Sequence, residues 1–169
     1  MLRAIFGRGA GTGSQVISIA LSTAIGAGRE VVWRALTQPS ELIRWDERIL
    51  ESLGPIEDYL SIGSCARWRY QLGGVPVILE ERPTLVAEPE RFDLDIDLGL
   101  FQFSIFYGLG REEADRTKLL IKLATQNSVS VVGGALDRFD VRRAAAEFID
   151  VRLRALQKWC ENHPGTAAG

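Results

Sequence analysis

Strict alternation of apolar and polar residues is the feature that most constrains how this chain can fold. Between Gln15 and Ile25, every second position is apolar or threonine: Ile17, Ile19, Leu21, Thr23 and Ile25. Side chains two positions apart in a β-strand point to the same face of a sheet, so these residues define a buried face. Similar stretches recur at residues 64–72, 75–86, 91–98, 101–109 and 117–126, with a further one at 50–59 interrupted by Gly54-Pro55. The pattern predicts an antiparallel sheet with one apolar face.

Two short helices are predicted directly after the first strand, within VVWRALTQPSELIRW at residues 31–45. The first has an apolar side made of Val32, Trp33 and Leu36. Pro39 cannot continue that helix but suits the first turn of the next one, where its missing N–H costs no hydrogen bond. The second helix takes its apolar side from Leu42, Ile43 and Trp45.

Glycine and proline also punctuate the strands. Gly73-Gly74 predicts a tight hairpin turn, and Pro83 predicts an edge or a bulge in the strand that follows this turn.

A long amphipathic helix is predicted near the end of the chain, from about Ala135 to Glu161. Its apolar stripe follows a seven-residue repeat with three flanking side chains: Phe139, Ala146, Leu153 and Cys160, joined by Leu136, Ile149 and Leu156. Such a stripe must pack on another apolar surface. Charged side chains are expected to face water on the opposite side: Arg142, Glu147, Arg152 and Arg154.

The element order is one strand, two short helices, about six further strands and one long helix, an α+β arrangement. This order and the segment VVWRALTQPSELIRW resemble the START-like or Bet v 1-like superfamily (SRPBCC, helix-grip fold), particularly its polyketide cyclase/dehydrase branch. The resemblance extends from Gln15 to Cys160. It implies a curved antiparallel sheet of about seven strands closed by the C-terminal helix. It also implies a large cavity between sheet and helix that binds lipids, polyketides, hormones or other apolar molecules.

The chain length fits one domain with flexible ends. We expect a flexible arm at residues 1–14, a START-like ligand-binding domain at 15–162 and a disordered tail at 163–169. A chain of 169 residues has the usual size of one domain and can bury a core with an internal pocket. A homodimer is compatible with the sequence.

Charge and cysteine content narrow the partners and the compartment. A net charge of −2 argues against a nucleic-acid surface, which needs a dense basic face. No segment approaches the about 20 apolar residues that span a bilayer, and the start lacks the apolar region of a signal peptide. Cys65 and Cys160 show no paired spacing, which favours reduced thiols in the cytoplasm.

Known catalytic and metal-binding motifs are missing. The only histidine, His163, stands beside a proline, which argues against histidine-based nucleophilic catalysis and histidine zinc sites. GRGAGTG at residues 7–13 fits neither phosphate-loop motif, so a flexible arm explains it better. DLDID at residues 93–97 resembles the start of a calcium loop but lacks its later glycine and glutamate. We expect no metal and no cofactor, and assign these aspartates to the solvent face of a strand.

Two adjacent glutamates offer a candidate for acid–base chemistry. Glu80 and Glu81 are neighbours on a strand, so one of them should point inward. A carboxyl group in an apolar cavity has a raised pKa and can donate a proton near neutral pH. The alternative is that an arginine such as Arg82 pairs with it. Arg143 on the last helix could similarly reach the cavity mouth or be exposed.

Aromatic side chains recur on the faces predicted to point inward. The predicted ligand-binding set combines five strand residues with two from helices: Trp68, Tyr70, Phe92, Phe103 and Tyr107, with Trp45 and Phe139. An ordinary packed core explains Phe92 and Phe103 equally well. Trp and Tyr need partners for their N–H and O–H groups, which favours a pocket with a few polar groups. Trp33 is expected to pin its helix to the sheet, whereas Trp45 could pin its helix or cap the pocket.

Three functions are compatible with these residues. The first is binding of a hydrophobic or aromatic small molecule such as a lipid or polyketide. The second is a polyketide aromatase/cyclase-type enzyme that positions a poly-carbonyl chain and moves protons through Tyr70, Tyr107 or the inward glutamate. The third is an adaptor working through the outer sheet face. The third is disfavoured, because Arg67 and Arg69 are expected opposite the aspartates of DLDID as cross-strand charge pairs.

Overall fold

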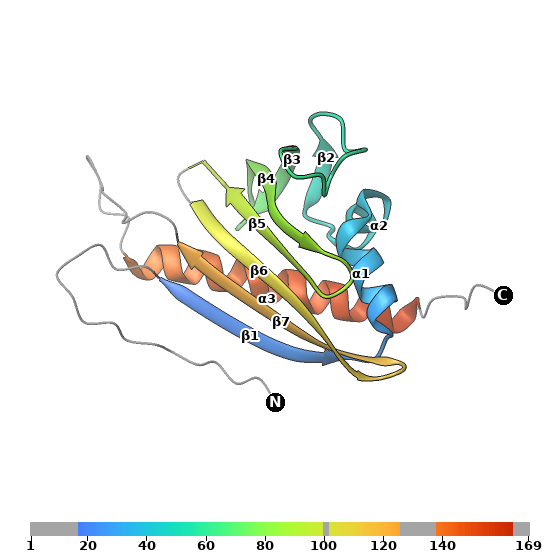
Figure 1. Cartoon of the computed structure of the whole chain (residues 1–169). Coiled ribbons are helices and arrows are strands. Elements are labelled where there is room, and N and C mark those ends of the chain that lie inside the picture. Colours follow the sequence, from blue (N-terminus) through green and yellow to red (C-terminus); the bar gives the residue numbers. More distant parts are fainter. Residues whose placement is uncertain (1–16, 100–101, 126–137, 164–169) are drawn as a thin grey trace.

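The computed structural model describes residues 17–99, 102–125 and 138–163, with side chains in the last range from residue 142 onward. The elements in these ranges are β1 Ser18–Ile25, α1 Arg29–Thr37, α2 Pro39–Trp45, β2 Ile49–Ser52, β3 Ala66–Leu72, β4 Val75–Ala87, β5 Arg91–Asp97, β6 Gln102–Glu113, β7 Arg116–Thr125 and α3 Arg138–Asn162 (Figure 1). The predicted arm, with its glycine-rich segment, and residues 164–169 of the predicted tail lie outside the described residues.

The strands form one antiparallel sheet in the order β1-β7-β6-β5-β4-β3-β2. The two ends of the strand region meet in this sheet, because β1 pairs with β7 from Ser18↔Ala124 to Ile25↔Thr117. The predicted antiparallel sheet with two short helices after the first strand is confirmed. The hairpin turn is also confirmed, since Gly73 and Gly74 have φ values of 54° and 85°, which favour glycine.

The predicted alternation fixes the two faces of the sheet. On β5 and β6 the buried side chains are the apolar ones at every second position: Phe92, Leu94 and Ile96, and Phe103, Ile105, Tyr107 and Leu109. The register of β4 against β5 shifts between Pro83 and Leu85, which confirms the predicted bulge. In Figure 1, α3 runs across the sheet behind β6 and β7 and covers its buried face.

The helices α1 and α2 pack beside α3 at one end of the sheet. Trp33 of α1 contacts Phe92 edge-on, with ring centroids 5.6 Å apart, so it pins α1 to the sheet as predicted. In α2, Leu42 and Trp45 are buried, but Ile43 is 39% exposed. The prediction that Ile43 belongs to the apolar side is wrong, because one residue turns the side chain by about 100° on a helix and only one side of α2 meets the core.

Charge pairing on the outer face differs from the prediction. The strand β4 separates β3 from β5, so Arg67 pairs with Glu80 (3.1 Å) and Arg69 with Glu51 (3.0 Å). The predicted pairs with the DLDID aspartates are therefore wrong. Those aspartates bind neighbours on β5 and β6: Arg91 for Asp93, Ser104 for Asp95 and Gln102 for Asp97.

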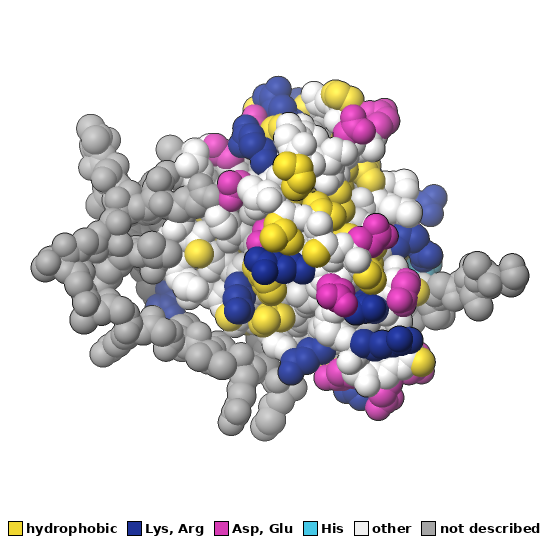
Figure 2. Space-filling view, viewed as in Figure 1, with side chains coloured by type: hydrophobic (Ala, Val, Ile, Leu, Met, Phe, Trp, Pro, Cys, Tyr) yellow, Lys and Arg dark blue, Asp and Glu magenta, His cyan; other side chains and the backbone are white. Residues whose placement is uncertain are grey.

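The face shown in Figure 2 mixes hydrophobic side chains with lysines, arginines and acidic residues. Large hydrophobic side chains are exposed at Ile43, Leu50, Ile62, Val75, Ile78 and Val86. Single exposed apolar side chains among charges are ordinary on a protein surface.

Candidate functional site

A buried ionic cluster lies between the sheet and α3, with Glu81 of β4 at its centre. Glu81 is 0% exposed. Its Oε2 accepts hydrogen bonds from the Tyr59 hydroxyl (2.9 Å) and from Trp68 Nε1 (3.0 Å). Its Oε1 accepts one from Arg152 Nη1 (3.0 Å). Opposite Glu81 on β3 stands Ala66, whose small side chain leaves room for these groups.

Glu80 and Glu81 point to opposite faces of β4, because consecutive side chains alternate along a strand. Glu81 points inward, and Glu80 points outward to Arg67 and Arg82. The prediction that one glutamate faces the interior is confirmed. The arginine that pairs with the inward carboxylate comes from α3, so it is Arg152 and not Arg82.

Arg152 joins the sheet, α2 and α3. Besides Glu81 it meets Asp46, with Nε and Oδ2 3.0 Å apart. Its guanidinium also lies 5.2 Å from the ring centroid of Phe148 and 5.7 Å from that of Trp45. Withdrawing each charge from water costs several kcal/mol, so the three ions are tolerated inside because each one has a partner.

The seven-residue repeat predicts that Arg152 faces water, and this prediction is wrong: Arg152 is 5% exposed. It follows Ile149 by three positions and Phe148 by four, which places it on their side of the helix. The buried stripe of α3 is wider than the repeat indicates: Ala145, Phe148, Ile149, Arg152, Leu153, Leu156 and Cys160. Arg143 is exposed, in agreement with the second of its two alternatives.

Asp46 is held in place by the turn that ends α2. Its N–H donates to the Leu42 carbonyl (3.0 Å), and its own carbonyl accepts from the N–H of Ile49 (2.9 Å). Its Oδ1 accepts from the N–H of Arg48 at 3.3 Å. Burial raises the pKa of the Asp46 carboxyl above its ordinary value, although Arg152 opposes this rise. Asp46 therefore retains a proton at higher pH than an exposed aspartate.

All three tyrosines of the chain lie around this cluster and are buried. Tyr59 donates to Glu81, and Tyr107 stacks on Phe92 with ring centroids 4.5 Å apart. The hydroxyl of Tyr70 is buried beside the Arg48 guanidinium, and its proton has no acceptor among the residues described. Burial is the main cause that raises the pKa of each tyrosine above the ordinary value of 10, so each is a neutral phenol at neutral pH.

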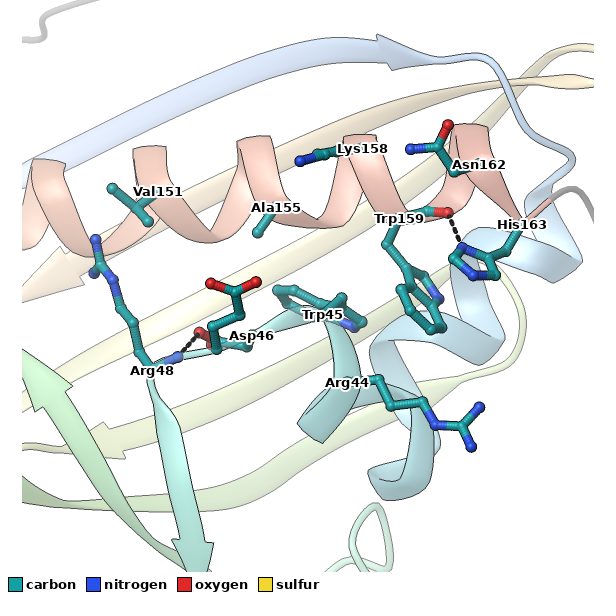
Figure 3. A pocket seen from close by; sticks show the side chains of 11 residues that line it. Arg44, Trp45, Asp46, Arg48, Val151, Ala155, Lys158, Trp159, Asn162 and His163 are labelled. Carbon is teal, nitrogen blue, oxygen red and sulfur yellow. Dashed lines mark hydrogen bonds between the residues drawn. The ribbon is translucent and has the colours of Figure 1, made fainter.

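An open groove of about 470 Å³ lies between residues 44–48 and the C-terminal half of α3 (Figure 3). From α3 it is lined by Val151, Ala155, Lys158 and Trp159. Asp46 belongs both to this lining and to the buried cluster, so the groove reaches the cluster from outside. The volume falls in the range of small-molecule pockets, about 300–1,000 Å³.

Two indoles border the groove, one from each side. Trp45 Nε1 donates to the Ala35 carbonyl at 2.7 Å, and Trp159 Nε1 donates to Glu41 at 3.4 Å. Trp159 also stacks on His163, with ring centroids 3.8 Å apart. Because both N–H groups are occupied, the two indoles offer the groove apolar surface and no free donor.

Solved structures share this architecture at low sequence identity. A START superfamily protein from Mycobacterium smegmatis superposes with a TM-score of 0.68 at 16% identity, covering 86% of this chain and 97% of that one. The Zhui aromatase/cyclase from Streptomyces sp. R1128 gives 0.68 at 15% identity, covering 92% and 99%. Ara h 8.0201 gives 0.67 at 11% identity, covering 88% and 99%. The chain has the START-like, helix-grip fold.

No protein-family model matches the sequence, and no curated protein does so either. The START-like resemblance therefore lies in the order and packing of the elements.

The START-like fold brings together most of the aromatic side chains predicted to bind a ligand. Five lie on the buried face of the sheet, each at most 5% exposed: Trp68, Tyr70, Phe92, Phe103 and Tyr107. They pack closely, and Tyr70 meets Phe148 of α3 with ring centroids 5.6 Å apart. Trp45 borders the groove. The side chain of Phe139 lies outside the described residues, so its predicted role stays a prediction.

Four residues of the buried cluster and its surroundings were not among the predicted site residues, namely Asp46, Tyr59, Phe148 and Arg152, and neither were Arg48 and Trp159 of the groove. Arg152 could have been found, because it follows Ile149 by three positions and Phe148 by four, which places these side chains on one side of a helix. Asp46 and Tyr59 stand in loops, where no periodicity indicates which way a side chain points.

Within the described ranges, no three His, Cys, Asp or Glu side chains come together in a group suited to a metal ion. None of the helices in these ranges combines the length and the apolar character needed to cross a membrane.

Proposed function

We propose that this START-like chain binds an apolar or aromatic small molecule between the sheet and α3, with the groove beside Trp45 as the way in. The observation that carries this proposal is the buried Tyr70 hydroxyl, whose proton has no acceptor among the described residues and whose ring packs on Phe148 in an aromatic interior.

An unpartnered hydroxyl in a protein interior is unusual. Leaving a buried polar group without a hydrogen bond costs about 1–3 kcal/mol, and native structures keep few such groups. A ligand that supplies an acceptor removes this cost on binding. Aromatic walls with a small number of polar groups are the usual composition of small-molecule sites.

The groove and the predicted aromatic residues form neighbouring parts of the proposed binding site. Trp45 belongs to the groove lining, and Arg152 lies over its ring, so the groove is separated from the interior by this indole and the ion cluster. A ligand could rest in the groove or pass Trp45 to contact Tyr70 and Tyr107. Either position accounts for the apolar surface on this side of α3.

A ligand screen with a blocked variant tests the proposal. Fatty acids, quinones and aromatic polyketides are screened by thermal shift and native mass spectrometry. At least one class should raise the melting temperature and appear as a bound mass. Ala155→Phe fills the groove and should abolish that shift, whereas Arg143→Phe on an exposed part of α3 should keep it. Absence of any hit, or equal binding by Ala155→Phe, contradicts the proposal.

A second candidate function is an aromatase/cyclase-type enzyme. The observation in its favour is Asp46, which lines the groove and whose pKa is raised by burial, the direction of shift that a general acid requires. The shared fold with the Zhui aromatase/cyclase adds support. Under this function, Asp46→Asn lowers turnover of a poly-β-ketone thioester by about 100-fold, a typical loss for one general acid. Glu80→Gln on the outer face serves as the control. Unchanged kinetics in Asp46→Asn, Tyr70→Phe and Tyr107→Phe would rule this function out.

A further inference from the structure

The groove lining carries more positive than negative charge. Arg44, Arg48 and Lys158 line it, and none of them forms an ion pair with another described residue. The lining also holds two carboxylates, Asp46, which meets Arg152, and Glu47, which forms no ion pair with another described residue. Three cations against two carboxylates leave a small surplus of positive charge, which favours an anionic ligand.

Two hydrogen-bond donors lie side by side here, Arg48 in the groove lining and the Tyr70 hydroxyl behind that lining. Nη1 of Arg48 and the Tyr70 hydroxyl oxygen are both shielded from solvent. The Arg48 guanidinium can donate to that oxygen, whereas the hydroxyl proton of Tyr70 has no acceptor among the described residues. Figure 3 shows the Arg48 side chain extending toward α3, whereas Arg44 points away from it.

We propose that these two donors bind the carboxylate of an amphipathic acid whose apolar body lies against Trp45 and Trp159. This inference rests on the proposed function and names the chemical class of its ligand. Arg48 offers one N–H and Tyr70 one O–H, which matches the two oxygens of a carboxylate.

The buried cluster favours a singly charged ligand. Asp46 and Glu81 share one guanidinium, so the interior next to Tyr70 already contains more carboxylates than the buried arginine balances. A doubly charged phosphate beside it would be repelled more strongly than a carboxylate.

Pairs of probes that share an apolar body and differ only in the acid group test the contribution of the carboxylate. We would measure calorimetrically the binding of 2-naphthoic acid and 2-naphthamide, and of decanoic acid and decanol, to the full chain. At least one acid should bind at least about tenfold more tightly than its neutral counterpart, as expected when a charge-assisted hydrogen bond is lost. Arg48→Gln should remove this preference. Tyr70→Phe should lower the affinity for the acid without lowering the affinity for the neutral probe. Arg154→Gln, which removes an exposed arginine of α3 outside the groove, should keep the preference.

The outcomes distinguish this inference from the proposed function. Equal affinity for acid and neutral probe, or an acid preference that survives Arg48→Gln in a variant of unchanged melting temperature, overturns the carboxylate site and leaves small-molecule binding intact. Tighter binding of 2-naphthyl phosphate than of 2-naphthoic acid overturns the choice of carboxylate. If no probe binds and the wider screen also finds no ligand, both proposals are wrong.

Discussion

Arg152 of α3 donates a hydrogen bond to Glu81 of β4 across 3.0 Å, between residues 71 positions apart in the chain. Both side chains are at most 5% exposed. Two positions further along the same helix, Arg154 pairs with Asp150 at the surface, with 75% of the Arg154 side chain exposed. The two arginines allow a direct comparison of a buried and an exposed ion pair.

Arg152→Met should lower the free energy of unfolding by about 3–5 kcal/mol, because it leaves two buried carboxylates without their cation. Arg154→Met should change it by less than about 1 kcal/mol, since an exposed pair contributes little. Urea unfolding followed by tryptophan fluorescence measures both values. Similar effects of the two substitutions would contradict the buried position of Arg152.

Removing the hydroxyl groups of Tyr59 and Tyr70 should have different effects on the free energy of unfolding. Tyr59→Phe loses a hydrogen bond to the Glu81 carboxylate and should cost about 1–3 kcal/mol of stability. Tyr70→Phe removes a hydroxyl whose proton has no acceptor among the described residues and should be neutral or stabilising in the ligand-free protein. Equilibrium unfolding of both variants measures the difference. A loss in Tyr70→Phe as large as that in Tyr59→Phe would show that the Tyr70 hydroxyl has a partner within the protein.

Titration of the tyrosines should be suppressed in the folded protein. Burial raises the pKa of Tyr59, Tyr70 and Tyr107 above 10, so the folded state holds these protons more tightly than the unfolded state. Stability must therefore fall as the pH rises above 10. Phenolate absorbance should stay low near pH 10, where free tyrosine is half ionised, and increase together with the loss of secondary structure. A gradual titration centred at 10 in the folded protein would be inconsistent with their burial.

The stability contributed by Asp46 should depend on pH in the direction opposite to that of a salt-bridged surface aspartate. Its pKa is raised above 3.8 by burial, so between 3.8 and the raised value the folded state binds more protons than the unfolded state. Its contribution to the free energy of unfolding therefore decreases as pH rises through this interval. The difference between wild type and Asp46→Asn, measured by urea unfolding from pH 4 upward, should decline. An increase with pH would mean that Arg152 outweighs burial.

The two cysteines should differ strongly in reactivity. Cys65 is exposed, whereas Cys160 is buried and its pKa is raised to about 12. A thiol reagent such as Ellman's should modify one thiol quickly in the native protein and the second only on unfolding. Cys65→Ser should remove the fast phase. A fast phase that remains in that variant would place Cys160 within reach of solvent.

Much of this architecture could be read from the sequence, because the period of two in the strands depends only on local geometry. The faces of β5 and β6, the hairpin at Gly73-Gly74 and the inward position of one glutamate all follow from it. The site itself depends on contacts between distant segments. Pairing of Arg152 with Glu81 and Asp46 needs the order of the sheet and the path of α3, and neither is encoded in a local pattern.

The wrong predictions also concern contacts between distant segments. The aspartates of β5 and the arginines of β3 lie on the predicted outer face, but β4 stands between these strands and decides which charges meet. The sides of Ile43 and Arg152 could not be predicted, because the buried side of a helix depends on the surface against which the helix packs. Local periodicity gives the face of a strand more reliably than the side of a helix.

The position of Arg152 also has a consequence for biosynthesis. A ribosome releases all seven strands and the end of α2 before it releases this arginine, so Glu81 of β4 and Asp46 after α2 are synthesised before their shared counter-ion. Burying both carboxylates in that state would bury unpaired charge. The interior can therefore close around charged carboxylates only when α3 docks and supplies the cation.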